Sequence, residues 1–240
     1  MPKSASHEPL QGRGVMSLVR AVVRDDAPEV AKLLAMSPSL AREHLAIGAT
    51  RTVAADFYFE EINHYLIAGD TPLHAAAAGY RKNIAEALIG NGAEINVKNR
   101  RGAGPLHYAA DGGPVLRGWN PQKQAEMISF LIKNGANPNL LDKSGVAPLH
   151  RAVRQRCPEA VDALLRHGAA VRLKNKSGST PLHLAVQNTG RGGTGSPESK
   201  SCQREIIELL LKAGADPRDK DGRGKTAREY ARSDWICALL

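Results

Sequence analysis

The feature that most constrains the fold of this chain is a segment that recurs four times. The copies "AGDTPLHAAAAG", "RGAGPLHYAADG", "SGVAPLHRAVRQ" and "SGSTPLHLAVQN" align without gaps and place prolines at Pro72, Pro105, Pro148 and Pro181. Each copy is followed by a second shared segment: "IAEALIGNGAEIN", "MISFLIKNGANPN", "AVDALLRHGAAVR" and "IIELLLKAGADPR". Such regular self-similarity predicts a stack of repeated units, because no single unit can bury its apolar face alone.

Local signals within each copy predict a pair of helices. Proline suits the first position of a helix, where its missing N–H would have had no partner, and a preceding Thr71 or Thr180 can cap that helix. Glycine directly after the apolar run, as in "LIGNGAEIN" and "LLKAGADPR", suits a left-handed C-terminal cap. Each copy therefore predicts a short helix, a turn, a second helix and a connection to the next copy.

These residues closely resemble the ankyrin repeat, whose T-P-L-H-x-A-A and L-L-x-x-G-A-D-x-N signatures they reproduce in order over about residues 66–240. A fifth, weaker copy is "RGKTAREYARSD", where Ala227 takes the proline position. The resemblance implies an all-α solenoid whose repeats each contribute two antiparallel helices and a β-turn finger. We predict repeats at 66–98, 99–141, 142–174 and 175–220, and a divergent cap at 221–240 in which Trp235 covers the last core layer.

The spacing between copies indicates two insertions. The intervals from Pro72 to Pro105 and from Pro148 to Pro181 are 33 residues, which is the ankyrin period. The interval from Pro105 to Pro148 is 43 residues, and that from Pro181 to Ala227 is 46. The extra residues, "DGGPVLRGWNPQKQ" and "NTGRGGTGSPESKSCQ", fall between the first and second helix of a repeat. A turn lengthened to about 17 residues costs only on the order of 1 kcal/mol of closure entropy, so we expect both repeats to stay intact.

The N-terminal region departs from the repeat pattern. We expect residues 1–14 to lack ordered structure and residues 15–240 to form one domain. Segment 15–41 has apolar residues at helical intervals on both sides of a break at 25–28, which predicts two helices. We interpret it as a divergent capping repeat, because a terminal repeat must cover the open end of the solenoid core.

Segment 42–65, between this cap and the first clear repeat, is too long for a finger. It contains four of the ten aromatic residues of the chain: Phe57, Tyr58, Phe59 and Tyr65. Clustered aromatic side chains favour packing, which would suit an added helix on the stack. The alternative is that they form part of a binding surface, and the sequence leaves both possibilities open.

Apolar runs and cysteine spacing constrain the cellular location that the sequence predicts. No apolar run approaches the roughly 20 residues needed to cross a bilayer. The first residues also lack the apolar stretch and cleavage site of a secretory signal. The cysteines Cys157, Cys202 and Cys237 are far apart and form no C-x-x-C pair, unlike those of disulfide frameworks and zinc sites. We therefore predict a cytoplasmic monomer without a membrane partner.

Four histidines occupy the same position in successive copies: His74, His107, His150 and His183. Packed helices lie about 8–10 Å apart, whereas zinc ligands meet within about 2 Å of one ion, so the repeat register excludes a shared metal site. The resemblance implies that each imidazole instead hydrogen-bonds the backbone of a neighbouring finger.

No familiar catalytic motif is present. The segment "DGRGKT" at 221–226 ends like a phosphate-binding loop, but that pattern requires glycine where this chain has Asp219. There is no nucleophile elbow, no H-E-x-x-H helix and no Cys/His catalytic arrangement. We therefore expect a protein that is not an enzyme and has no cofactor, no metal and no small-molecule substrate.

Cations recur at the tips of the predicted fingers. The net charge is −2 over residues 1–70 and +11 over residues 71–240. Counting back from the proline positions places Arg100, Arg101, Lys143, Lys176 and Arg223 at the tips. Charges stacked about 10 Å apart repel by only ~0.4 kcal/mol per pair in water, and salt reduces this further. Such a row can attract an acidic partner; the alternative is that the charges serve solubility alone.

Two more groups are candidates for contact with a partner. Arg151 and Arg154 fall on the first helix of the third repeat, which by the resemblance lines the concave face. Trp119 lies in the first insert, and tryptophan and arginine are favoured at interface hot spots. Packing of Trp119 against a neighbouring helix is the alternative.

The pattern favours a scaffold for protein–protein interaction that binds an acidic protein through its fingertips, its concave face and its two inserts. The alternative is a nucleic-acid-binding protein that uses the same basic stripe. Against this, no recognised nucleic-acid module is present, and aromatic residues make up only 4% of the chain, with few among the basic residues for base stacking. Ankyrin arrays bind unrelated targets on one scaffold, so the sequence does not identify the partner.

Overall fold

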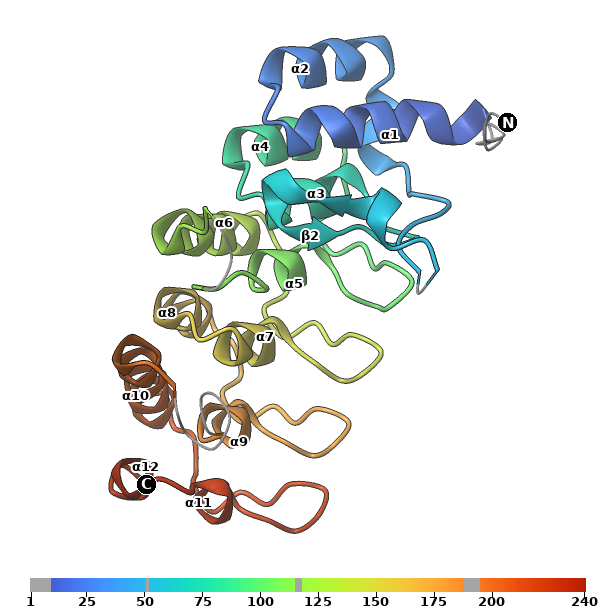
Figure 1. The fold of residues 1–240 in the computed structure, drawn as a ribbon. Coiled ribbons are helices and arrows are strands. Elements are labelled where there is room, and N and C mark those ends of the chain that lie inside the picture. The colour runs from blue at the N-terminus through green and yellow to red at the C-terminus, as the bar shows by residue number, and fades with distance from the viewer. Residues whose placement is uncertain (1–9, 51, 115–117, 188–194) are drawn as a thin grey trace, which may run out of the picture.

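The structure, a computed structural model, describes residues 10–50, 52–114, 118–187 and 195–240. Its helices stack in pairs into one elongated array that runs from the N-terminus to the C-terminus (Figure 1). The first helices of the pairs are α1 (Leu10–Val23), α3 (Pro72–Ala78), α5 (Pro105–Ala109), α7 (Pro148–Arg154), α9 (Pro181–Ala185) and α11 (Ala227–Tyr230). The second helices are α2 (Ala27–Met36), α4 (Lys82–Gly90), α6 (Pro121–Lys133), α8 (Pro158–Arg166), α10 (Pro197–Lys212) and α12 (Asp234–Cys237). The predicted all-α solenoid is confirmed.

The core runs along the length of the stack, between the two layers of helices. In α3, α5, α7 and α9 the leucine that follows the first proline is at most 2% exposed: Leu73, Leu106, Leu149 and Leu182. Alanines fill the remaining inner positions of α3, where Ala75, Ala76 and Ala77 are fully buried, and such small side chains let adjacent first helices approach closely. Each fully buried leucine contributes roughly 1.5–3 kcal/mol, so every pair gains stability from its neighbours.

The first helix pair begins earlier than predicted. Helix α1 starts at Leu10, so the prediction that residues 1–14 lack structure is wrong for 10–14, and residues 1–9 lie outside the described residues. Helix α1 packs on α3, and α2 packs on α4. The apolar side of α1 is buried through Leu18, Val19 and Val22. Because this face continues the core, the pair covers its N-terminal end, and the 3-10 turn η1 (Pro38–Arg42) follows it.

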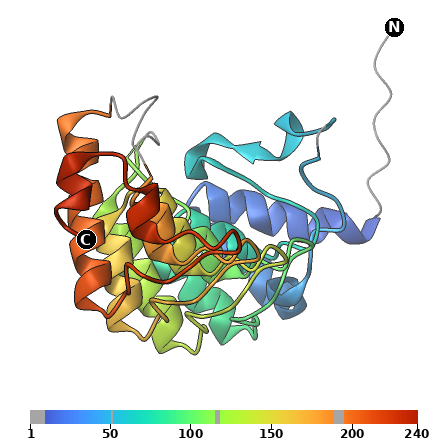
Figure 2. The same ribbon diagram turned by 90° about the horizontal axis from the view of Figure 1, so that it is seen from below.

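The aromatic-rich segment forms a hairpin and not the added helix that was one of its two predicted forms. Strands β1 (Tyr58–Phe59) and β2 (His64–Tyr65) pair antiparallel, with Tyr58 opposite Tyr65. The 3-10 turns η2 (Ala55–Phe57) and η3 (Glu60–Ile62) flank and connect the strands. We call residues 55–65 the hairpin, and it stands out from the stack as a separate ridge (Figure 2).

Both inserts lie between the two helices of a repeat, as predicted, but part of each is helical. Helix α6 begins at Pro121 and α10 at Pro197, so the second helices of these repeats extend into the inserts. Residues 115–117 and 188–194 of the inserts lie outside the described residues. The repeats without inserts instead turn tightly through one residue with left-handed backbone, Tyr80 (φ 55°) or Arg156 (φ 62°).

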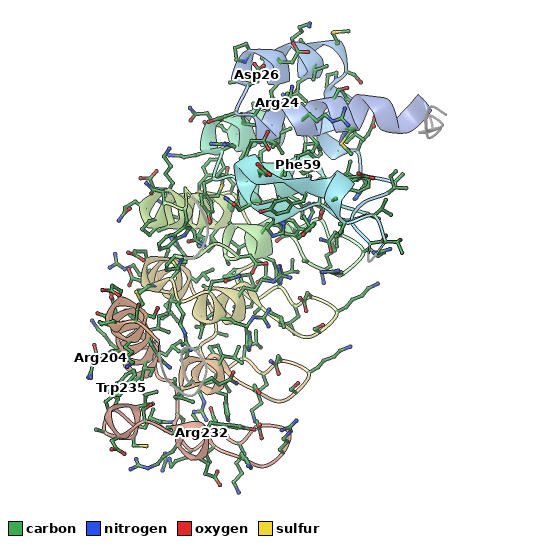
Figure 3. All side chains as sticks on the ribbon, viewed as in Figure 1. Arg24, Asp26, Phe59, Arg204, Arg232 and Trp235 are labelled. Carbon is green, nitrogen blue, oxygen red and sulfur yellow. The ribbon has the colours of Figure 1, made fainter. Side chains whose placement is uncertain are left out.

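The last pair closes the C-terminal end, with a different residue at its centre than predicted. Ile236 is 1% exposed and fills the core position, whereas Trp235 is only half-buried. The guanidinium carbon of Arg204 on α10 lies 5.1 Å from the centre of the Trp235 ring, so this side chain packs over the edge of the core (Figure 3).

Candidate functional site

The fingers between the helix pairs are built on one repeated side-chain device. At the base of the third-repeat finger, Asp142 Oδ1 accepts hydrogen bonds from the backbone N–H of Ser144 and Val146 at 2.8 and 3.0 Å. The same pair of bonds is made by Asn99, Asn175 and Asp221 in the other fingers. Short Asp and Asn side chains suit this position because they can bond to their own backbone two residues on.

Neighbouring fingers approach each other closely at their tips. Gly145 has a φ of 71°, in the left-handed region that favours glycine, and a Cβ placed on it would lie 2.7 Å from the backbone N of Lys176. Only glycine fits both the turn and the contact. The fingers are therefore packed elements of the stack.

A ladder of backbone hydrogen bonds joins successive fingertips. Lys143 N–H donates to the Arg101 carbonyl at 2.9 Å, and Lys176 N–H donates to the Ser144 carbonyl at 3.1 Å. Two further bonds extend the ladder in both directions. Arg100 N–H donates to the Ala68 carbonyl at 3.1 Å, and Gly222 N–H donates to the Ser177 carbonyl at 2.9 Å. The main chain itself therefore holds the tips in register.

The predicted tip cations lie along this ladder, and all are exposed: Arg100, Arg101, Lys143, Lys176 and Arg223. None of these five side chains forms an ion pair with any residue that the structure describes. Together they form a row of uncompensated positive charge, which we call the tip row.

The four repeat histidines lock each finger to the helix pair before it. In each, Nδ1 accepts the backbone N–H of the residue that precedes the helix-starting proline, as His74 does from Thr71 at 3.1 Å. The ring is therefore neutral with its proton on Nε2, which donates to a carbonyl of the next finger at 3.0–3.2 Å. The acceptors are Ala103, Val146, Ser179 and Lys225. This confirms that the imidazoles bond to neighbouring fingers.

Burial keeps three of these imidazoles, those of His74, His107 and His150, uncharged. Desolvation lowers the pKa of His74 and His150, and it lowers the pKa of His107 to about 4. Among the described residues, no three His, Cys, Asp or Glu side chains come together in an arrangement that could hold a metal ion.

The two predicted arginines of the concave face differ in their surroundings. Arg151 is paired internally, because its guanidinium lies 2.9 Å from the Asp111 carboxylate and 3.2 Å from that of Asp142, and its side chain is only 14% exposed. Arg154 is exposed and pairs with no described carboxylate. Of the two, Arg154 offers the freer charge.

Asp111 connects the first insert to this face. Burial alone would raise the pKa of its carboxyl, but the nearby His64 ring and the charge of Arg151 outweigh this effect and hold the pKa below its usual range. Gln155 also donates a hydrogen bond to Asp111, at 2.8 Å. The carboxylate therefore ties together the hairpin, the first insert and α7.

Trp119 is half-buried and fixed by a hydrogen bond. Its indole N–H donates to Gln124 Oε1 at 2.7 Å. The rest of its side chain packs on the core and lines a surface hollow of about 710 Å³ together with Tyr58, Arg81 and Lys123. We call this the outer hollow. Part of the Trp119 side chain is therefore packed, and part is exposed at the outer hollow.

Two further hollows lie on the other side of the hairpin. The hairpin groove, of about 720 Å³, lies between the hairpin and the finger of the second repeat and is lined by Tyr65, Arg100, Arg101 and Arg151 among others. The finger hollow, of about 490 Å³, is lined by Arg100, Arg101, Arg151, Lys143, Arg154 and Asp142 among others. The two share three arginines, so they are adjacent parts of one surface.

Sequence reasoning named Tyr65 of this surface as part of an aromatic cluster, but it did not single out His64. His64 stacks on Tyr108 with ring centres 4.3 Å apart and lies 3.7 Å from the Asp111 carboxylate. Only the cluster of aromatic residues in 57–65 indicated that the segment mattered. Tyr108 and Asp111 are 44 and 47 residues away from His64 in the chain, and nothing in the local sequence points to these contacts.

Comparison with known proteins agrees with the geometry. A family model for ankyrin repeats in three copies matches residues 18–117 and 120–221. A comparison with curated proteins gave no match. Ankyrin repeats are generally modules for protein–protein interaction and typically act as non-catalytic scaffolds. No helix among the described residues combines the length and hydrophobicity needed to span a bilayer. Because the matched segments cover most of its length, the chain belongs to the ankyrin repeat family.

Proposed function

We propose that this protein is a non-catalytic scaffold that binds an acidic protein through its fingertips, its concave face and its first insert. The observation that carries the proposal is the tip row, in which five exposed cations, without an ion pair to any described residue, are held in register by backbone hydrogen bonds. Fixed charges of one sign steer an oppositely charged partner and set its register. Because the backbone beneath them is already ordered, binding a partner costs little backbone entropy at the tips.

The contributions of the other candidate residues follow from their surroundings. Arg154 adds an exposed cation beside the tip row. Arg151 acts mainly by orienting Asp111 and Asp142, because both of its ion pairs are internal. Trp119 offers the exposed part of its ring at the outer hollow, where a large aromatic surface supports a partner contact.

Charge reversal at the tips tests the proposal. Arg100, Arg101 and Lys176 replaced together by glutamate should abolish capture of the natural partner in affinity purification from the source cells, because attraction becomes repulsion. The melting temperature should hardly change, since exposed side chains without ion pairs contribute little to stability.

The matched control reverses three lysines on the second helices, Lys82, Lys133 and Lys212, which are exposed and lie away from the fingers. This variant has the same net charge as the tip variant and should still capture the partner. Equal capture by both variants, or equal loss in both, would contradict a role for the tip row.

Nucleic-acid binding through the same cations is the alternative outcome. Binding by charge alone weakens steeply with salt, so we expect weak association with oligonucleotides that disappears by physiological ionic strength. Tight, sequence-specific binding at that ionic strength would replace the scaffold proposal. Cytoplasmic location and a monomeric state remain predictions from the sequence.

A further inference from the structure

The hairpin carries two tyrosines that its own packing does not bury. Tyr58 and Tyr65 face each other across the strands with ring centres 4.8 Å apart, and they are 37% and 47% exposed. Phe57 and Ile62, by contrast, are buried to 8% and 6% and attach the hairpin to the core. The segment therefore uses some apolar side chains for packing and leaves these two aromatic rings at the surface.

The hairpin is held against the helix stack through His64. His64 stacks on Tyr108 of α5 and lies within 3.7 Å of the Asp111 carboxylate. Tyr108 is fixed in turn, because its hydroxyl donates to the buried Asp70 carboxylate at 2.8 Å. At the base of the hairpin, Leu66 N–H donates to the Phe57 carbonyl at 3.0 Å. The ridge is thus a fixed wall of the hairpin groove.

The two tyrosines border different hollows. Tyr65 lines the hairpin groove beside Ala49, Ala54 and Ile67, which gives that end of the groove an apolar wall. Tyr58 lines the outer hollow instead, next to Trp119. Only Tyr65 therefore adjoins the basic surface.

The charge of the surface is strongly unbalanced. The hairpin groove and the finger hollow together contain five cations: Arg100, Arg101, Lys143, Arg151 and Arg154. Their two carboxylates, Asp111 and Asp142, are both paired with Arg151. The four remaining cations have no ion-pair partner among the described residues, so the unsatisfied charge is positive and lies next to the apolar wall.

We infer that the hairpin groove and the finger hollow form one binding site for an extended acidic peptide segment that carries a large aromatic side chain. The aromatic side chain packs against Tyr65, Ala49 and Ala54, and the neighbouring carboxylates pair with Arg100, Arg101, Lys143 and Arg154. The inference rests on the proposed scaffold function and adds the chemistry of the segment that is bound. It also gives the hairpin a role in recognition.

Other occupants complement this surface less well. The segments that the structure does not describe contain a single acidic residue, Glu8, so the chain itself supplies no acidic segment. A second copy carries a net charge of +9. A single-stranded nucleic acid would need successive aromatic rings for base stacking, and Tyr65 is the one exposed aromatic side chain lining either hollow.

Synthetic peptides of defined composition test the inference directly. The probe is a fluorescein-labelled peptide with one tryptophan followed by four glutamates, and binding to the full chain is measured by fluorescence anisotropy at physiological ionic strength. A peptide with alanine for tryptophan and one with glutamine for glutamate are the comparisons. We expect each comparison peptide to bind at least about tenfold more weakly than the probe.

Two hairpin variants separate recognition from stability. Tyr65→Ala should weaken binding of the probe by about tenfold while leaving the alanine peptide unaffected, because only the aromatic contact is lost. Tyr58→Ala removes the same ring-to-ring contact from the other strand but should leave probe binding unchanged, since Tyr58 borders the outer hollow. Tyr65→Phe, which retains the ring, should bind like the unaltered chain.

The results distinguish this inference from the proposed function. Equal effects of Tyr65→Ala and Tyr58→Ala, or none from either, would overturn the inference. In that case, loss of partner capture by the tip variant would leave the scaffold function standing. Oligonucleotide binding as tight as that of the probe at the same salt concentration would overturn both.

Discussion

The histidine at the third position of α3, α5, α7 and α9 joins two repeats by its protonation state. Its Nδ1 must accept a backbone N–H while its Nε2–H donates to a carbonyl of the next finger, as at His107, where the Val146 carbonyl is 3.0 Å away. A second proton on the ring would break the bond at Nδ1 and place a charge in the core. The fold therefore depends on neutral imidazoles in successive layers.

This dependence predicts a loss of stability in mild acid. The unfolded chain takes up protons near pH 6.5, whereas the lowered pKa values of His74, His107 and His150 delay uptake in the folded state. The contribution of these neutral histidines to the free energy of unfolding is thus fully present above about pH 6.5 and is lost as the pH falls. With a folded pKa of about 4, His107 alone accounts for ~2 kcal/mol of the loss between pH 7 and pH 5.

Urea unfolding of the unaltered chain and of His107→Gln at the two pH values measures this effect. The variant should be less stable at pH 7, because it loses the link between repeats, yet its stability should fall less on acidification. An identical pH dependence in the two proteins would show that His107 does not titrate as described.

The hydrogen bonds of these histidines were predictable from the resemblance to the ankyrin repeat, and the repeat register places all four in one environment. The internal pairing of Arg151 was not predictable. Its main partner, Asp111, lies at the start of an insert 40 residues away, where register carries no information. Sequence periodicity thus specifies contacts between repeats and leaves those made by inserted residues undetermined.

At the scale of single elements, the lengthened second helices compensate for the inserts. In α6, the buried Gln124 donates to the carbonyls of Ala109 and Gly112 at 2.9 and 3.1 Å, where the preceding helix ends. In α10, Gln203 does the same for Ala185 and Gln187, at 2.6 and 2.7 Å. Each glutamine donates to carbonyl groups at the end of the first helix of its repeat, where the tight turn of the other repeats is replaced by an insert.

The two glutamines should differ in how much they contribute. Gln124→Met should destabilise the protein by ~1–3 kcal/mol, because it leaves the indole N–H of Trp119 and two backbone carbonyls without this partner. Gln203→Met should cost less, because Arg156 also donates to the carbonyls of Ala185 and Gln187 at 2.9 and 2.7 Å. Urea unfolding of both variants gives the comparison, and a larger loss in the α10 variant would contradict this account.

The helices themselves follow from apolar periodicity and from the prolines that begin them, but the hairpin does not. Its strands have two residues each, too few for an alternating pattern to appear. What holds it is tertiary: Phe57 and Ile62 in the core and His64 on the ring of Tyr108. A cluster of aromatic residues indicates that a segment packs or binds, but it does not indicate which secondary structure the segment forms.

For the whole molecule, stability accumulates from one helix pair to the next. Each pair contacts mainly its immediate neighbours, so terminal pairs protect the faces that would otherwise meet water. At the C-terminal end, Ala227 and Ile236 are buried to 0% and 1%, and the Lys225 carbonyl accepts the bond from His183. The last pair therefore shields α9 and α10.

Removal of residues 221–240 should consequently destabilise the helices at the C-terminal end of the stack more than those near the N-terminal end. Losing the burial of Ile236 alone removes roughly 1.5–3 kcal/mol. In hydrogen–deuterium exchange, amides of α9 and α10 should exchange faster than in the full chain, while those of α3 and α4 should keep their protection. Uniform loss of protection along the chain would instead show that the repeats unfold as a single cooperative unit.

The backbone ladder between the fingertips has a consequence for how binding preferences diversify. Since the bonds between neighbouring tips are made by peptide groups, the exposed side chains of Arg101, Lys143 and Lys176 are free to vary without disturbing the frame that presents them. Exchanging a lysine for a glutamate or a tyrosine at one tip alters what is recognised at that point and leaves the adjacent points unchanged. New specificities are therefore reachable by single substitutions, each acting nearly independently of the others.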